Sequence, residues 1–275
     1  MPVSETILLY YFSSLAERFI THATMTVYLS SIVYHSQQRG VPLKVKHMPR
    51  LRHLLRGIRR TQGGRLSRPR RQPVSLHHMA ALRSFLSSHF HPYDARMLWA
   101  ALTSALFGLL RASEFTSPSH STTSPSTLLA SHLSFSPNFS KATLFLPCSK
   151  TDQFGAGVSI PLFPLPSHLC PVSALAHFIA LRRQVDGPLF LFADGTYLTR
   201  RHIVDTLRAT FPAQPGLNTH SFRAGGASAL ASAGLPDYVI QIVGRWSSDS
   251  FLRYIHLGDD MLKQFQEAMI APAAE

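Results

Sequence analysis

The chain has 275 residues, of which 45% are hydrophobic, and this composition indicates a globular protein rather than a disordered one. No apolar run approaches the roughly 20 residues needed to span a bilayer, and the N-terminus lacks the features of a signal peptide, so we expect an intracellular protein. The two cysteines, Cys148 and Cys170, have no metal-type spacing and are expected to be structural thiols.

The formal net charge of +13 is concentrated at the front of the chain. Residues 1–73 carry 13 of the 27 Lys and Arg residues but only Glu5 and Glu17 of the 14 acidic ones. A surface of this kind suits the phosphate backbone of a nucleic acid, because each neutralised phosphate releases counterions. Membrane surfaces attract the same charge, so composition favours a nucleic-acid partner without excluding others.

Short helices are expected in the front segment, where apolar residues recur at helical spacing from Ile7 to Ile58. Pro49 should open the last of them, a helix with one apolar and one cationic side. Gly, Pro and Arg then dominate residues 61–73, which predicts a linker and a domain boundary after Arg71. The arginines expected to contact DNA are Arg50, Arg52, Arg56, Arg59, Arg60, Arg70 and Arg71.

Residues 72–275 predict a second domain of mainly α, or α+β, class. Apolar β-branched segments at 128–135, 142–147 and 158–162 predict a small three-stranded antiparallel sheet. Helices are expected at 76–86, 93–110, 172–183, 199–210, 221–233, 236–243 and 261–269.

Several residues of this second domain suit phosphodiester chemistry, which needs a nucleophile, cations around the phosphate and an acid for the leaving oxygen. His220 and Arg223 stand three apart at the start of a helix and so share a face. We expect Arg111 at the end of the buried helix 93–110, and Lys150 in the turn between the second and third strands. For each residue alone, a cap, a surface position or a core position is the commoner explanation.

Taken in order, these residues resemble the tyrosine recombinase, or phage integrase, family, and the resemblance covers nearly the whole chain. The segment Leu-Arg-Ala-Ser-Glu contains Arg111 and Glu114, Cys-Ser-Lys-Thr-Asp contains Lys150, and His-Ser-Phe-Arg supplies the His-x-x-Arg pair. The resemblance implies seven catalytic positions: Arg111, Glu114, Lys150, His220, Arg223, Trp246 and Tyr254.

Tyr254 is the nucleophile that this resemblance implies, attacking a DNA phosphate to give a 3′-phosphotyrosyl link. Tyr238 is the rival candidate for the nucleophile, but we expect it on the apolar side of its helix. Trp246 and Tyr254 are eight residues apart, one fewer than in bacterial and phage members. That step and the Gly-Arg-Trp-Ser-Ser-Asp segment look more like recombinases of eukaryotic DIRS-type retroelements.

The resemblance implies double-stranded DNA as partner, a homo-oligomer of two to four copies on DNA, no membrane, no metal and no cofactor. It implies a helical core-binding domain at 1–71 and a catalytic domain at 72–275, in a DNA-associated protein that is nuclear if eukaryotic. Two alternatives stay open. One is a catalytically idle DNA-binding protein derived from a mobile element, and the other is a type IB topoisomerase-like enzyme.

Overall fold

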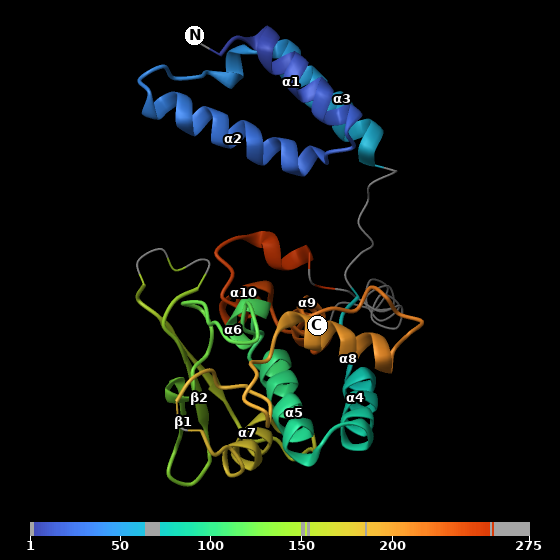
Figure 1. Cartoon of the computed structure of the whole chain (residues 1–275), viewed down its shortest axis with the longest axis vertical. Coiled ribbons are helices and arrows are strands. Elements are labelled where there is room, and N and C mark those ends of the chain that lie inside the picture. Colours follow the sequence, from blue (N-terminus) through green and yellow to red (C-terminus); the bar gives the residue numbers. More distant parts are fainter. Residues whose placement is uncertain are drawn as a thin grey trace, which may run out of the picture. The chain divides into compact units, whose positions relative to one another are not determined.

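The computed structural model describes residues 3–63, 72–149, 152, 155–184, 186–253 and 255. The chain forms two compact units, Met1–Pro69 and Arg70–Glu275 (Figure 1). Four predicted site residues lie outside the described residues: Arg70, Arg71, Lys150 and Tyr254. The helix expected at 261–269 lies outside them as well.

The smaller unit consists of α1 (Glu5–Glu17), α2 (His22–Gln38), the short η1 (Val45–His47) and α3 (Pro49–Gly63). Its core includes Phe12, Met25 and Leu51, each fully buried. Side chains also join the helix ends, because orphan N–H groups there need acceptors. Glu5 accepts from the backbone N–H of Leu51 at 3.1 Å, and Gln62 accepts from that of His22 at 2.7 Å.

The larger unit is organised around α5 (Pro92–Phe107). Its apolar residues occur on nearly every face, and every residue from Met97 to Leu106 except Trp99 is buried, as expected for a helix enclosed by its neighbours. The helix α4 (Leu76–His89) packs on one side of it, and α7 (Pro171–Ile179) on the other (Figure 1).

A three-stranded antiparallel sheet, in the order β1-β2-β3, accompanies α7. The strands are β1 (Leu133–Phe135), β2 (Ala142–Leu146) and β3 (Val158–Leu162), and the short η2 (Ala130–His132) leads into the first. Alternate residues of β2 face the core, with Leu144 and Leu146 fully buried. The predicted mainly helical fold with one small sheet is confirmed.

The remaining elements complete the unit: α6 (Ala112–Phe115), α8 (Arg200–Thr210), α9 (His220–Ser232), α10 (Asp237–Gly244) and η3 (Asp249–Arg253). The helix α9 passes very close to other backbone, since a Cβ on Gly225 would lie 2.1 Å from the carbonyl oxygen of Val74, and one on Gly226 would lie 2.5 Å from that of Leu106. Glycine at both positions lets α9 pack tightly against these segments.

Three expectations were wrong. The helix predicted at 93–110 ends at Phe107, because the buried Leu109 and Leu110 belong to a turn, so Arg111 caps α6 and does not end α5. The strand predicted at 128–135 is shorter than expected: only β1 is strand, because η2 occupies the residues directly before it. Tyr238 is 64% exposed and does not join the buried side of α10, which is marked by Ile240.

Candidate active site

The candidate site is built around the turn that follows α5. Gly108 caps the helix, and Leu109 adopts a left-handed backbone conformation with φ of 45°. This conformation is uncommon for a residue with a side chain, and here the Leu109 side chain is buried beside Ile240 and Phe251. The carbonyl groups of Gly108 and Leu109 both accept hydrogen bonds from arginines. The backbone of this turn therefore binds the guanidinium groups of two arginines, Arg223 and Arg245.

Arg111 and Glu114 form a braced pair at the start of α6. The Nη1 of Arg111 lies 2.9 Å from Oε1 of Glu114, and the backbone N–H of Arg111 donates to Oε2 at 2.8 Å. Glu114 is fully buried, whereas the Arg111 side chain is 15% exposed. A buried carboxylate needs charged or hydrogen-bonding partners, and two bonds to one residue restrict its orientation. Glu114 therefore holds the guanidinium of Arg111 in place near the surface.

Arg223 lies in the first turn of α9 and is only 1% exposed. Its Nη1 donates to the carbonyl of Leu109, and its Nη2 donates to the carbonyl of Gly244 at the end of α10. One planar guanidinium thus joins the turn after α5 to the end of α10. This rigid fork is a property that arginine has and lysine lacks.

The indole of Trp246 covers Arg223, with the Cζ atom of Arg223 4.1 Å from the ring centroid. Gly244 makes this stacking possible, because a Cβ on Gly244 would lie only 1.6 Å from Cζ3 of Trp246. A phosphate could contact the guanidinium of Arg223 only after Trp246 or the backbone beside it had shifted. Trp246 also packs beside Phe251 in η3, with ring centroids 6.1 Å apart.

Arg245 belongs to the same cluster, although it was not among the site residues predicted from the sequence. It donates to the carbonyls of Gly108 at 2.9 Å and Leu109 at 3.1 Å, and to Oε2 of Glu114 at 3.0 Å. Burial lowers the pKa of the Arg245 guanidinium from its usual range, and the charge of Glu114 opposes that change. An arginine pKa is high enough for the group to stay protonated.

His220 opens α9, one turn before Arg223, and is half-buried. Its backbone N–H donates to Oδ1 of Asn218 at 2.9 Å. Residues three apart on a helix share a face, so His220 and Arg223 lie on the same side of α9. The described part of the site thus brings together Arg111, Glu114, Arg223 and Trp246, with His220 one helical turn away.

Among the described residues no group of His, Cys, Asp and Glu has the arrangement of a metal site. No helix in the described ranges is both long and apolar enough to cross a membrane.

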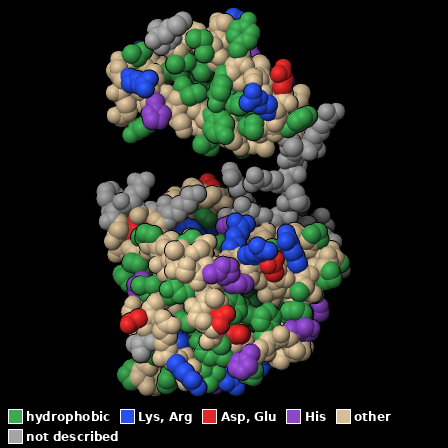
Figure 2. Space-filling view, viewed as in Figure 1, with side chains coloured by type: hydrophobic (Ala, Val, Ile, Leu, Met, Phe, Trp, Pro, Cys, Tyr) green, Lys and Arg blue, Asp and Glu red, His purple; other side chains and the backbone are tan. Residues whose placement is uncertain are grey.

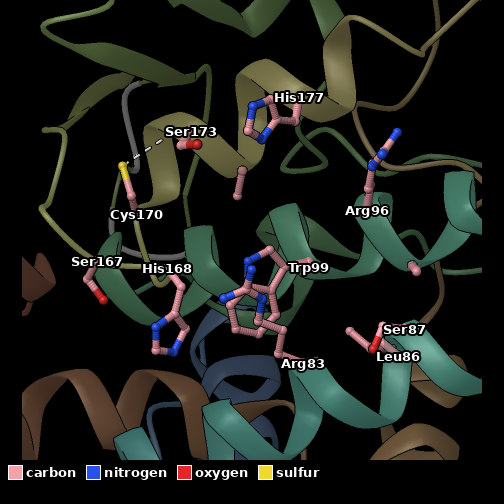
Figure 3. A pocket seen from close by; sticks show the side chains of 12 residues that line it. Arg83, Leu86, Ser87, Arg96, Trp99, Ser167, His168, Cys170, Ser173 and His177 are labelled. Carbon is pink, nitrogen blue, oxygen red and sulfur yellow. Dashed lines mark hydrogen bonds between the residues drawn. The ribbon is translucent and has the colours of Figure 1, made fainter.

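A separate cavity of about 260 Å³ lies between α4, α5 and α7 (Figure 3). Trp99 and Arg83 lie side by side there, with the Cζ of Arg83 6.0 Å from the ring centroid, and His168 and His177 also line it. Its residues on α5 belong to the first half of that helix, whereas the arginine cluster follows the helix end. From Trp99 to Phe107, the last residue of α5, a rise of 1.5 Å per residue gives roughly 12 Å, so this cavity is not part of the cluster that follows the helix.

Basic side chains occur on both units. All five predicted arginines of α3 are exposed, and none forms a salt bridge with a residue that the structure describes. Figure 2 shows basic side chains over α8 as well, where Arg201 and Arg208 lie within 3.4 and 4.0 Å of Asp205. Within the described residues, the arginines of α3 therefore carry charge that no ion pair with Asp or Glu offsets.

Comparison with known proteins gives a structural match only. The sequence matches no family model and no curated protein sequence. Among solved structures, the Tn1549 transposon integrase in complex with a circular intermediate DNA matches with a TM-score of 0.59 and 15% identity, over 97% of this chain and 85% of that one.

Two further solved structures resemble this chain. XerA recombinase matches with a TM-score of 0.52 and 16% identity, over 97% of this chain and 90% of that one. XerH site-specific recombinase, in a post-cleavage complex with a palindromic difH substrate, matches with a TM-score of 0.52 and 13% identity. That match covers 72% of this chain but only 53% of XerH. The chain therefore has the fold of the tyrosine recombinases.

Proposed function

We propose that the protein is a site-specific DNA recombinase or integrase that cleaves and rejoins duplex DNA through a 3′-phosphotyrosyl intermediate on Tyr254. The observation that carries the proposal is the convergence of Arg111, Arg223 and Trp246 on the turn after α5, in a chain with the recombinase fold. Phe251 belongs to the same buried apolar cluster as Leu109 of that turn, and Ile255 packs against this cluster. The sequence neighbours of Tyr254 thus belong to the structure around the arginines.

Arginines suit the phosphate-binding role, because a guanidinium can donate two parallel N–H groups to the non-bridging oxygens of one phosphate. Their charge offsets the negative charge that develops as the phosphorus becomes five-coordinate. It also lowers the cost of forming a tyrosine phenolate, whose ordinary pKa is about 10. Glu114 orients Arg111, and His220 and Trp246 each have an N–H that can donate to a phosphate oxygen.

Strand cleavage forms a bond between the tyrosine oxygen and phosphorus and breaks the bond from phosphorus to the 5′ oxygen. The phenol loses its proton to solvent water, and Lys150 gives a proton to the departing 5′ oxygen. Rejoining reverses the step, with the 5′ hydroxyl of a partner strand as the attacking group. Because the covalent intermediate retains the phosphoester, the exchange needs neither ATP nor a metal.

Duplex DNA is the proposed partner, with several copies of the chain assembling on two DNA sites. The smaller unit would act as a core-binding domain that holds DNA through α3, and Arg70 and Arg71 would add to that contact. A DNA-associated location follows, nuclear if the source is eukaryotic. The kinship with DIRS-type retroelement recombinases rests on the Gly-Arg-Trp segment and the short step to Tyr254, and it is a proposal from sequence alone.

A suicide substrate tests the function. Duplexes bound by the full chain are first selected from a randomised pool, and the recovered sequence is then built into a duplex nicked beside the cleavage position. Loss of the short 5′-hydroxyl strand prevents rejoining, so covalent protein–DNA adducts should accumulate. We expect adducts with the wild type and none with Tyr254→Phe.

Tyr238→Phe is the matched control, because Tyr238 is the rival tyrosine and is exposed; it should form adducts at the wild-type rate. Adducts that persist in Tyr254→Phe would disprove the assignment of the nucleophile. Binding without any adduct would favour an idle DNA-binding protein. Relaxation of supercoiled DNA without recombinant product would favour the topoisomerase-like alternative.

A further inference from the structure

Arg245 has a left-handed backbone conformation, which is unusual for a residue with a side chain. It caps α10 in the left-handed conformation, with φ of 58° and ψ of 43°. Helix ends of this kind usually place glycine or asparagine there, because in this conformation a Cβ atom comes too close to the following carbonyl oxygen. Residues held in such conformations are fixed by their surroundings. The contacts of Arg245 supply that restraint.

The side chain of Arg245 is 11% exposed and reaches from the end of α10 to the turn after α5. There it donates to two carbonyl groups, those of Gly108 and Leu109, at the C-terminal end of α5. The last carbonyls of a helix lack partners within the helix and carry partial negative charge. A guanidinium at this point satisfies both carbonyls and fixes the turn from which Arg111 follows.

Glu114 shares its two carboxylate oxygens between two arginines. Oε1 accepts from Nη1 of Arg111, and Oε2 accepts from Nη2 of Arg245. Without Arg245, the fully buried carboxylate would keep Arg111 as its one arginine partner among the described residues and would offset that charge completely. With Arg245 present, the three arginines and Glu114 carry a net charge of about +2 at neutral pH.

The main chain at Arg245 completes the arrangement. The carbonyl of Arg245 accepts from Nη2 of Arg111 at 3.1 Å, and the preceding carbonyl, that of Gly244, accepts from Nη2 of Arg223. Two consecutive carbonyl groups thus hold Arg111 and Arg223, the two arginines proposed to bind the phosphate. The same short segment continues into Trp246 and, eight residues later, Tyr254.

We propose that Arg245 is a positioning residue for DNA cleavage: it shares the charge of Glu114, and its side chain and carbonyl together hold Arg111 in register with Arg223. This proposal rests on the recombinase function proposed above. Arg245 acts through Glu114 and Arg111 and does not itself contact the reacting atoms. Its removal should slow cleavage while leaving DNA affinity nearly unchanged.

The test compares Arg245→Met and Arg245→Lys with the wild type, using single-turnover adduct formation by the full chain on the nicked duplex. By analogy with the loss of one oxyanion-binding donor, cleavage by Arg245→Met should be about 100-fold slower. Arg245→Lys keeps the charge but cannot make the paired hydrogen bonds of a guanidinium, so its cleavage rate should lie between those of the wild type and Arg245→Met. Arg83→Met is the control, since Arg83 lines the separate cavity and should leave the rate unchanged.

Two further measurements separate positioning from a purely structural role. On a duplex with a neutral methylphosphonate at the cleavage position, the defect of Arg245→Met should shrink by about 10-fold or more, because less negative charge has to be stabilised. The double variant Glu114→Gln/Arg245→Met should cleave faster than Arg245→Met, since it no longer carries a carboxylate that offsets Arg111. A thermal melt of each variant checks that it is folded.

Each outcome has a definite meaning. If the wild type forms adducts and folded Arg245→Met cleaves within about threefold of it, a span of only some 0.7 kcal/mol, the role of Arg245 is disproved and the recombinase function stands. A slow Arg245→Met whose defect is the same on both substrates, and is not relieved by Glu114→Gln, also overturns the role. If the wild type binds DNA but forms no adduct, the recombinase function itself fails and this role falls with it.

Discussion

The indole of Trp246 lies over the guanidinium of Arg223, 4.1 Å from ring centroid to Cζ, in a site where Arg223 is almost completely buried. An arginine proposed to bind phosphate is thus covered by a residue proposed to act beside it. Two effects follow for Trp246 under the proposed function: it would orient Arg223, and it would have to shift when DNA binds. Both effects can be measured.

Replacing Trp246 by alanine should slow adduct formation, because Arg223 loses its stacking partner. A desolvated cation–π contact contributes about 1–2 kcal/mol, which corresponds to roughly 5- to 30-fold in rate. Trp246→Phe keeps a ring over the guanidinium and should stay within a few fold of the wild type. Single-turnover rates on the nicked duplex give the comparison, and equal rates for Trp246→Ala and wild type would contradict the assignment.

Gly244→Ala displaces the same ring without changing Trp246. Its new methyl group would lie 1.6 Å from Cζ3 of the indole, so the ring must move. We expect a loss of rate similar to that of Trp246→Ala. The shift on binding can be followed by fluorescence in a Trp99→Phe background, where Trp246 is the single tryptophan. An emission spectrum that DNA leaves unchanged would count against the shift.

Arg111→Lys should reduce cleavage far more than binding. Lysine keeps the positive charge but cannot make the paired contacts that join Arg111 to Glu114 and to the carbonyl of Arg245. Loss of one such donor group costs about 3–4 kcal/mol of transition-state stabilisation, or 10²- to 10³-fold in rate. Adduct rates and filter-binding affinities measured on the same nicked duplex separate the two effects. A variant that loses affinity as strongly as rate would show that Arg111 mainly binds DNA.

The sequence predicted those features of the fold and of the site that depend on local spacing. His220 and Arg223 at i and i+3 share a face of α9, and Pro49 opens α3 as its ring geometry favours. The short strands β2 and β3 were also visible, because their apolar and β-branched residues form compact runs bounded by turn residues.

Arg245 could not be predicted, because its position depends on a packing contact between other residues. A glycine after an apolar helical run normally marks the left-handed residue that ends the helix. Here Gly244 is still helical and leaves room for the ring of Trp246, and the left-handed residue is Arg245 instead. The exposure of Tyr238 could not be predicted either. The apolar pattern of α10 does not show which face of the helix the rest of the unit covers.

Replacing Arg52, Arg56 and Arg59 of α3 by glutamine should make DNA binding less sensitive to salt. The three residues stand at i, i+4 and i+7, so they form one exposed stripe. If all three contact phosphates, the slope of log affinity against log salt should become less steep by about 2.7, at 0.9 per contact. Fluorescence anisotropy between low and physiological salt measures the slope.

Arg201→Gln/Arg208→Gln is the matched control for the stripe, because both arginines are exposed but pair with Asp205. We expect its slope to stay close to that of the wild type. A triple variant of α3 with an unaltered slope would remove the basis for assigning DNA binding to the smaller unit.

Acidification should destabilise the larger unit through His202. The Nδ1 of His202 accepts the backbone N–H of Thr199 at 3.1 Å, at the start of α8, and this requires an unprotonated nitrogen. Burial lowers the pKa of His202 from its ordinary value of 6.5, with a smaller contribution from His120. The unfolded chain therefore takes up this proton first as pH falls. Stability should be constant above about pH 7 and decline below 6.5, levelling once the folded protein also binds the proton.

His202→Gln provides the comparison, because a glutamine at this position can still accept the N–H of Thr199 but does not titrate. The variant also loses ring contacts to Phe192 and His120, so its stability at pH 8 is expected to be lower. The informative quantity is the change in the urea midpoint between pH 8 and pH 5.5, which should be smaller in His202→Gln than in the wild type. His132, whose pKa burial also lowers, is unaltered in both proteins and accounts for part of the remaining change. Equal changes in the two proteins would mean that acid sensitivity arises elsewhere.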